Sequence, residues 1–171
     1  MVGCAKPDIN VTDANGNNVK VSSDGTKMTS TDKDGKTTTI ETGATTGSVS
    51  VKDEKGTTTA ETGTSLSEAD LGIGFYPGST EKTGVSAKSD TPDGKSAMSV
   101  RTSTDEPTKV AEFYKGKVKE ANVMSMGDAT HDVQMVTGKL ESGGTVTVSA
   151  SREKGKTETD INVTTVIPKK K

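Results

Sequence analysis

The chain has 171 residues, of which 27% are hydrophobic, and it contains no Trp, two Phe and two Tyr. So few large apolar side chains exclude a thick, evenly packed core. The 22 basic and 24 acidic side chains nearly cancel, which argues against the basic face that a nucleic-acid-binding protein needs.

Residues 1–7 contain the one cysteine of the chain, Cys4, which follows Gly3 and precedes polar sequence. This start resembles the lipobox of bacterial lipoprotein precursors, in which the cysteine becomes the acylated first residue of the mature chain. The resemblance implies lipid attachment at Cys4 and a place in the bacterial cell envelope, either periplasmic or at the outer membrane or cell surface. Because no charged and apolar leader precedes Cys4, we expect Met1 to begin a chain trimmed to its mature region.

Residues 8–63 form a Thr-rich repeat in which short β-branched runs are separated by turn sequences. Ile9 and Val11 alternate with polar residues before Asn15-Gly16, and Val19 and Val21 do so before Asp24-Gly25. Alternation interrupted by Asn-Gly or Asp-Gly indicates β-hairpins, because these turns need residues that tolerate positive φ. The expected strands are 9–11, 19–21, 26–30, 36–42, 49–51 and 57–62, and the short turns favour an antiparallel meander.

Burial limits how these repeats are arranged. Each expected strand offers one or two aliphatic residues on one face and Thr, Ser, Lys or Asp on the other. Such strands cannot fill both layers of a sandwich by themselves. Three arrangements remain: a single-layer sheet, a slim β-solenoid, or a sheet whose aliphatic face rests on the second half of the chain.

The character of the sequence changes after residue 63. Ser65–Asp70 predicts a brief helical turn, and Leu71–Gly78 is the most apolar window of the chain. Asp70-Leu71-Gly72-Ile73 and Tyr76-Pro77-Gly78 resemble a group of uncharacterised bacterial lipoproteins, and the resemblance extends to about Val166. It implies a structural turn followed by an α+β module and brings no established activity. Gly74-Phe75 stands where that group commonly has a proline and an aliphatic residue.

Residues 64–168 predict this α+β module, with one helix on an antiparallel sheet. Ser103–Pro107 is a helix start with capping side chains and an early proline. Apolar residues at three- and four-residue spacing predict a helix from Pro107 to about Ala121. The expected strands are 84–89, 97–102, 123–126, 132–140, 145–152 and 157–167, and a basic tail occupies 169–171. The fold class is therefore β-rich, α+β.

Tyr76, Tyr114 and His131 are the candidates for binding a small ligand or metal in this half. His131 lies beside Asp132 and after Asp128, an acidic cluster able to orient a general base. No second histidine, nucleophilic cysteine or Gly-x-Ser-x-Gly segment accompanies it, so catalysis is not predicted.

The aromatic residues form two adjacent pairs, Phe75-Tyr76 and Phe113-Tyr114, for which a small core is favoured over a stacking surface. Asp32-Lys33-Asp34-Gly35 is similar to the opening of a calcium loop, but its later ligand positions do not fit. We therefore expect a β-turn at Asp32–Gly35, and neither a metal site nor a cofactor.

These patterns predict a non-enzymatic, lipid-anchored envelope or surface protein with a structural or adhesive role and the capacity to self-assemble. The expected partners are the membrane, through the lipid on Cys4, and an envelope protein or further copies of the chain. The alternative is a small-ligand or metal-binding module in the C-terminal half. Asp8–Thr12 also recurs identically as Asp160–Thr164, which two similar strands suffice to explain.

Overall fold

The structure is a computed structural model, and it describes residues 8–12, 18–22, 26–42, 47–54 and 56–169. Cys4 lies outside these residues, as do the predicted turns Asn15-Gly16 and Asp24-Gly25. The fold is β-rich, with antiparallel strands and two short helices in the described part. The chain divides into two compact units, which we call unit 1 (Met1–Glu61 and Ser89–Pro92) and unit 2 (Thr62–Lys88 and Asp93–Lys171). Among the described helices, none has the length and apolar character needed to cross a membrane.

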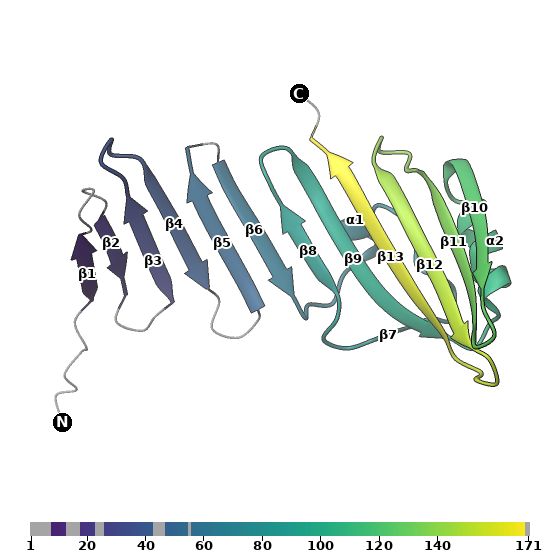
Figure 1. Cartoon of the computed structure of the whole chain (residues 1–171). Coiled ribbons are helices and arrows are strands. Elements are labelled where there is room, and N and C mark those ends of the chain that lie inside the picture. The colour runs from purple at the N-terminus through teal and green to yellow at the C-terminus, as the bar shows by residue number, and fades with distance from the viewer. Residues whose placement is uncertain (1–7, 13–17, 23–25, 43–46, 55, 170–171) are drawn as a thin grey trace. The chain divides into compact units, whose positions relative to one another are not determined.

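Unit 1 consists of strands joined in chain order (Figure 1). Its described strands are β1 (Ile9–Thr12), β2 (Asn18–Val21), β3 (Lys27–Thr31), β4 (Thr37–Thr42), β5 (Gly47–Asp53) and β6 (Gly56–Thr62). Consecutive strands from β1 to β5 pair antiparallel, so unit 1 is a meander rather than a β-solenoid. The predicted strands are thereby confirmed, with shifts of at most two residues at their ends.

The turn between β3 and β4 forms as its sequence predicts. The Asp32 carboxylate accepts hydrogen bonds from the backbone N–H groups of Asp34 and Lys36, both at 2.9 Å. Gly35 has φ +80°, a value that L side chains rarely adopt. In the Asp-Lys-Asp-Gly sequence, the Asp32 side chain therefore accepts the backbone hydrogen bonds of a tight turn.

The register of unit 1 aligns its aliphatic residues. Ile9 pairs with Val21, Val21 with Met28, Met28 with Ile40 and Ile40 with Val51. Because directly opposed residues share a face, these five residues form one line across five strands, which we call the aliphatic row. The neighbouring position on each strand gives a polar line on the other face, formed by Asn10, Lys20, Thr29, Thr39 and Lys52.

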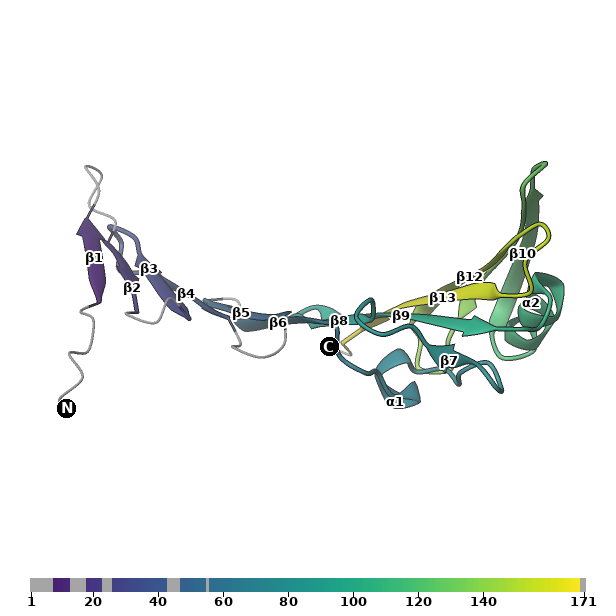
Figure 2. The ribbon, with the colours of Figure 1, turned by 90° about the horizontal axis from the view of Figure 1, so that it is seen from below.

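No described residue of unit 1 is buried. Figure 2 shows β3, β4, β5 and β6 nearly edge-on, as one layer. Ile9 is 60% exposed and Val11 55% exposed, although both belong to strands. Backbone pairing and cross-strand side-chain contacts, rather than an apolar interior, therefore hold unit 1 together.

Unit 2 contains the helices and the remaining strands. They are α1 (Glu68–Leu71), β7 (Thr80–Glu81), β8 (Ala87–Asp90), β9 (Gly94–Ser103), α2 (Pro107–Lys115), β10 (Lys119–Gly127), β11 (His131–Lys139), β12 (Thr145–Glu153) and β13 (Thr159–Pro168). The strand order is β8-β9-β13-β12-β11-β10, and β7 pairs with β9. The last two residues of β8 fall in unit 1.

One face of the unit 2 sheet carries the hydrophobic core. Val136, Val148 and Val163 are opposed across β11, β12 and β13, and each is at most 1% exposed. Both helices pack on this face, α2 against β10, β11 and β12 and α1 against β9 and β13. Val110 and Tyr114 from α2 and Leu71 from α1 are fully buried there.

The Leu71–Gly78 segment forms a cap and a turn. Ser67 is the N-cap of α1 in a capping box with Asp70, which satisfies two backbone N–H groups at the start of this short helix. Gly72 ends the helix with φ +68°, and the backbone N–H of Ser79 donates to the carbonyl oxygen of Tyr76 at 3.1 Å. The predicted helical turn and the Tyr-Pro-Gly turn are thereby confirmed.

The helix predicted to reach Ala121 is wrong at its C-terminal end, because α2 ends at Lys115 with Gly116 as its C-cap. From Lys119 the chain pairs with β11, and Val118 packs toward Gly138, where an added Cβ would lie 2.5 Å from a Val118 methyl carbon. The expected capping side chains are also absent: Glu106 is the N-cap and makes no side-chain capping bond. Pro107 does open the helix as predicted.

The strand predictions for unit 2 are confirmed with shifted bounds, most of all for 123–126, where β10 begins at Lys119, and for 84–89, where β8 begins at Ala87. The short β7 has no counterpart among them. The chain leaves the Tyr-Pro-Gly turn directly into this two-residue strand, where Thr80 pairs with Thr102. A two-residue strand is too short to show the alternation of apolar and polar residues by which strands are predicted from sequence.

The repeated pentapeptide gives a matched test of where the stability resides. Ile161 in β13 is fully buried, whereas the equivalent Ile9 in β1 is 60% exposed. We expect Ile161→Ala to lower the free energy of unfolding of unit 2 by about 2–5 kcal/mol. We expect Ile9→Ala, which lies in unit 1, to lower the free energy of unfolding of unit 2 by less than about 0.5 kcal/mol. Urea unfolding followed by tyrosine fluorescence checks this, because both tyrosines lie in unit 2; equal losses would contradict the assignment of the core.

Candidate interaction surface

Unit 1 presents two different open faces. The aliphatic row, with Val11 and Val19 beside it, makes one face apolar, and the line through Lys20, Thr29 and Thr39 makes the other polar. Ion pairs between exposed partners join neighbouring strands, such as Lys20–Asp8 at 3.0 Å and Lys27–Glu41 at 2.7 Å. Each contributes less than about 1 kcal/mol, so they set the register more than the stability.

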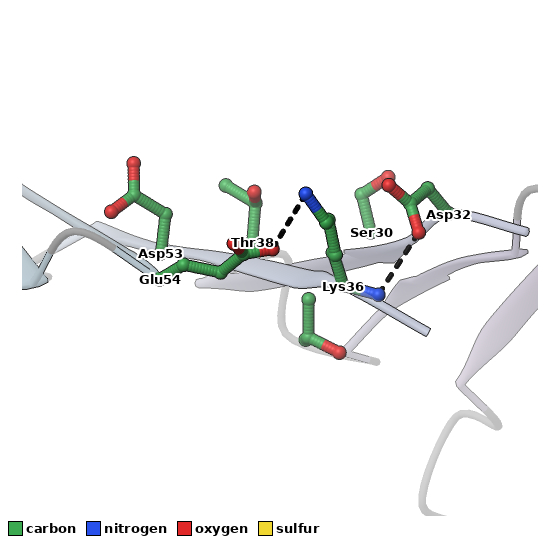
Figure 3. Close-up of a pocket in the computed structure, with 7 residues that line it drawn as sticks. Ser30, Asp32, Lys36, Thr38, Asp53 and Glu54 are labelled. Carbon is green, nitrogen blue, oxygen red and sulfur yellow. Dashed lines mark hydrogen bonds and ion pairs between the residues drawn. The ribbon is translucent and has the colours of Figure 1, made fainter. Parts of the chain in front are cut away.

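A shallow pocket lies at one end of the aliphatic face of unit 1 (Figure 3). The Lys36 ammonium lies 3.4 Å from a Glu54 carboxylate oxygen, and the Asp32 carboxylate is engaged by the turn. Its other lining residues are Ser30, Thr37, Thr38 and Asp53. These groups make a polar border to the aliphatic row, where Lys36, Asp53 and Glu54 are exposed and Asp32 is half-buried.

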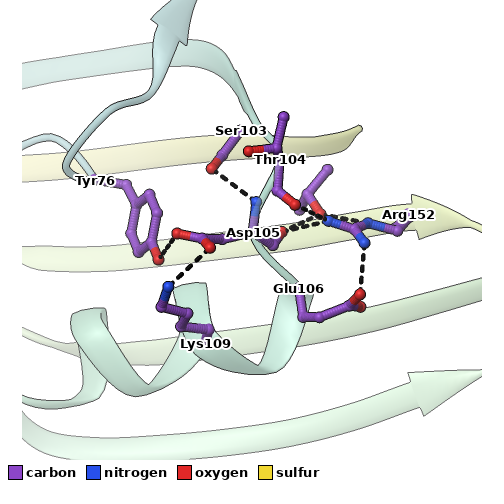
Figure 4. A network of polar contacts seen from close by, with 8 residues as sticks. Tyr76, Ser103, Thr104, Asp105, Glu106, Lys109 and Arg152 are labelled. Atoms are coloured by element: carbon purple, nitrogen blue, oxygen red, sulfur yellow. Dashed lines mark hydrogen bonds and ion pairs between the residues drawn. The ribbon is translucent and has the colours of Figure 1, made fainter. Parts of the chain in front are cut away.

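In unit 2, a buried arginine ties the start of α2 to two strands (Figure 4). The Arg152 side chain is 9% exposed and donates from Nη2 to the carbonyl oxygens of Thr104 and Asp105, at 2.8 and 2.6 Å. It also donates from Nε to Thr159 Oγ1 at 2.9 Å and from Nη1 to Glu106 Oε1 at 2.7 Å. Because every side of the guanidinium is satisfied, the arrangement is a clamp rather than a site open to ligand.

Asp105 extends this network to the Tyr-Pro-Gly turn. The Lys109 ammonium donates to one of its carboxylate oxygens at 2.8 Å, and the Tyr76 hydroxyl donates to the other at 2.7 Å. These two hydrogen bonds, that of Lys109 first, lower the pKa of Asp105. Burial, followed by the hydrogen bond to Asp105, raises the pKa of Tyr76 to about 12.

Tyr76 and Tyr114, two of the predicted ligand-binding residues, come together in the core through Phe113. The Tyr76 and Phe113 rings lie 5.3 Å apart and the Phe113 and Tyr114 rings 5.0 Å apart, both edge-to-face. Tyr114 is fully buried, and burial raises its pKa to about 12. The aromatic pairs therefore pack α2 against the turn, as the sequence favours.

His131, the third candidate, lies apart from both tyrosines at the start of β11. Its backbone N–H and that of Thr130 donate to Asp128 Oδ1, at 2.8 and 2.6 Å. Hydrogen bonds from Thr130, hydroxyl first, and then from the His131 backbone lower the pKa of Asp128 to about 2. The exposed pocket that His131 lines includes Glu153, Glu158 and Asp160 but neither tyrosine.

Ligand binding by Tyr76, Tyr114 and His131 as one group stays a prediction that the geometry does not favour. Within the described residues, no three His, Cys, Asp or Glu side chains gather closely enough to hold a metal ion. The clamp at Arg152 was missed by sequence reasoning. The sequence did contain one signal for it: Arg152 occupies an inward position of an alternating strand, between Ala150 and the turn at 154.

Replacement of Arg152 tests the clamp. Arg152→Met keeps most of the side-chain volume but removes the guanidinium donor from the carbonyl groups of Thr104 and Asp105, of which Asp105 keeps its hydrogen bond from the Thr159 hydroxyl, so we expect a loss of about 1–3 kcal/mol in the free energy of unfolding. Lys156→Met, at an exposed position nearby, serves as the matched control and is expected to stay within about 0.5 kcal/mol. Chemical unfolding measures both, and equal effects would show that the clamp contributes nothing specific.

Tyrosine ionisation gives a second test. A raised folded-state pKa means that the contribution of Tyr76 and Tyr114 to stability is complete below the unfolded pKa of 10.0 and is lost as the pH rises toward about 12. We expect the absorbance of tyrosinate to appear near pH 12 in the native protein and near pH 10 in urea. Tyr76→Phe isolates the titration of Tyr114; native titration at the urea value would refute the buried placement.

No protein family, curated protein or solved structure matches the chain. The resemblance of Asp70–Ile73 and Tyr76–Gly78 to bacterial lipoproteins therefore stays an expectation from sequence, and the geometry of the two units carries the functional argument.

Proposed function

We propose that this chain is a non-enzymatic protein of the bacterial cell envelope or surface, anchored by a lipid on Cys4, that acts by contact through the open sheet of unit 1. Its role is structural or adhesive, and it includes self-association. Unit 2 is the α+β module of this proposal, a folded body with its own core. The observation that carries the contact role is that unit 1, within its described residues, holds ordered strands without a single buried side chain.

The two faces of unit 1 support a contact role over a catalytic one. A row of aliphatic side chains reaches across five strands, and Ile9, Met28 and Val49 are each more than a third exposed. Exposed apolar groups arranged in a line, with polar groups on both sides, are typical of interaction surfaces. The Thr side chains opposed on β3 and β4, such as Thr31 and Thr37 at 3.2 Å, keep the layer regular without a core.

The polar networks of unit 2 support a structural role for the residues most capable of chemistry. The hydrogen bonds of Arg152 and Asp105 hold the start of α2, and those of Asp128 stabilise the turn between β10 and β11. Asp128, one of the two carboxylates that could orient a general base at His131, thus accepts hydrogen bonds from backbone N–H groups of its own turn. On this proposal unit 2 is a folded support, and the contacts with partners are made by unit 1.

The anchor rests on Gly3-Cys4 and the polar sequence after it, and metabolic labelling tests it. We expect radioactive palmitate to label the protein made in bacteria with a lipoprotein signal sequence placed before Cys4, and to leave Cys4→Ser unlabelled. The labelled protein is expected in the membrane fraction. The Cys4→Ser protein, with the same signal, serves as the matched control, and equal label in both would end the proposal of a lipid at this position.

A further inference from the structure

The pentapeptide Asp-Ile-Asn-Val-Thr occurs in two structural settings within one chain. As Asp160–Thr164 it lies in β13, paired on one side with β12 and on the other with β9. As Asp8–Thr12 it contains β1, which among the described strands has β2 as its one neighbour. Its two aliphatic residues are fully buried in β13 and more than half exposed in β1. The same sequence thus supports pairing on both sides in unit 2 and uses one side in unit 1.

The outer edge of β1 lacks the features by which proteins block an edge strand. β10, the edge strand of unit 2, carries Lys119 and Glu120, a shift in register between Lys119 and Asn122, and a positive φ at Glu120. β1 pairs with β2 in an unbroken register, and Ile9–Thr12 contain no charged residue, proline or bulge; the charge of Asp8, just before them, is paired with Lys20 at 3.0 Å. Bulges, charges and prolines are the devices that keep edges from pairing with other chains. β10 is therefore protected and β1 is open.

We propose that β1 pairs antiparallel with β1 of a second copy of this chain, about a two-fold axis at Asn10. This register opposes Ile9 to Val11 of the second copy, and Asp8 to Thr12 of the second copy. It is the register that pairs all five residues of the repeat, and it gives a closed, isologous contact in which each copy contributes the same surface.

Every opposed pair in this register is chemically compatible. Asp8, which already pairs with Lys20, meets a hydroxyl rather than another carboxylate. Asn10 meets its own equivalent, and a side-chain amide both donates and accepts, so two amides satisfy each other. Ile9 and Val11 lie on the face of the aliphatic row, so the row of one copy continues into that of the next. The surface is thus complementary to itself.

The contact is small, and this fits a tethered protein. Five residue pairs bury far less than the ~1,200 Å² of a stable interface, so dimers in dilute solution are weak. Anchoring on a membrane raises the effective concentration of the copies. The inference rests on the self-association in the proposed function and specifies its surface and register.

Charged pairs at positions 9 and 11 test the register. In the 171-residue chain carrying Cys4→Ser, which excludes disulfide dimers, we expect concentration-dependent dimers by sedimentation equilibrium up to about 1 mM. Ile9→Lys with Val11→Lys opposes like charges at both symmetric positions, and we expect dimers to be lost. Ile9→Lys with Val11→Glu opposes unlike charges at both, and we expect dimers to return. This rescue separates loss of pairing from loss of folding, and circular dichroism follows the strand content of each variant.

The control places the same added charge inside the sheet, as Met28→Lys with Val49→Lys on β3 and β5. We expect this variant to dimerise like the parent protein, because neither residue lies at the edge. Loss of dimers in this control, with dimers kept in the double-lysine β1 variant, would overturn the edge contact while keeping self-association through the open face. A monomer in every variant and in the parent protein would overturn self-association itself, and palmitate labelling would still decide the anchor independently.

Discussion

The chain has few large apolar side chains, and their burial on one face of the unit 2 sheet is the constraint on which the rest of the structure depends. Leu71, Val110 and Tyr114 reach this face from the two helices, and the inward positions of β9, β11, β12 and β13 complete it. Every buried side chain among the described residues belongs to unit 2. Unit 1 is left with one aliphatic row on a sheet of Thr, Ser, Lys and Asp, and its faces remain open.

The repeated pentapeptide separates what local sequence determines from what its neighbours determine. Alternation of Ile and Val with Asn and Thr produces a strand at both places, which is why the strands of the meander and of unit 2 were predictable. Burial differs because α1 and the 66–76 segment cover β13, whereas no described element covers β1. The spacing of Val118 and Ala121 misled the helix prediction for a related reason: pairing with β11 satisfies the backbone after Gly116 better than another helical turn.

The partners of Arg152 were beyond sequence reasoning because they are distant in the chain. Arg152 contacts the carbonyl of Asp105 across 47 positions, and Tyr76 reaches the carboxylate of Asp105 across 29. Nothing in the local pattern around Asp105 distinguishes this role from a helix cap. Tyr76 and Tyr114, which have recognisable chemistry, are buried and pack on Phe113, while Arg152, the buried charge among the described residues, belongs to no sequence motif.

The meander of unit 1 has a consequence for how its length can change. In the described part, contacts among β1 to β5 join each strand to its neighbours in sequence, and no shared interior couples distant strands. Stability in such an arrangement adds strand by strand, as in repeat proteins. Loss or duplication of one hairpin would cost or add one strand interface and leave the others intact. Evolution can therefore adjust the span of this sheet in steps of two strands, without redesigning the unit that carries the core.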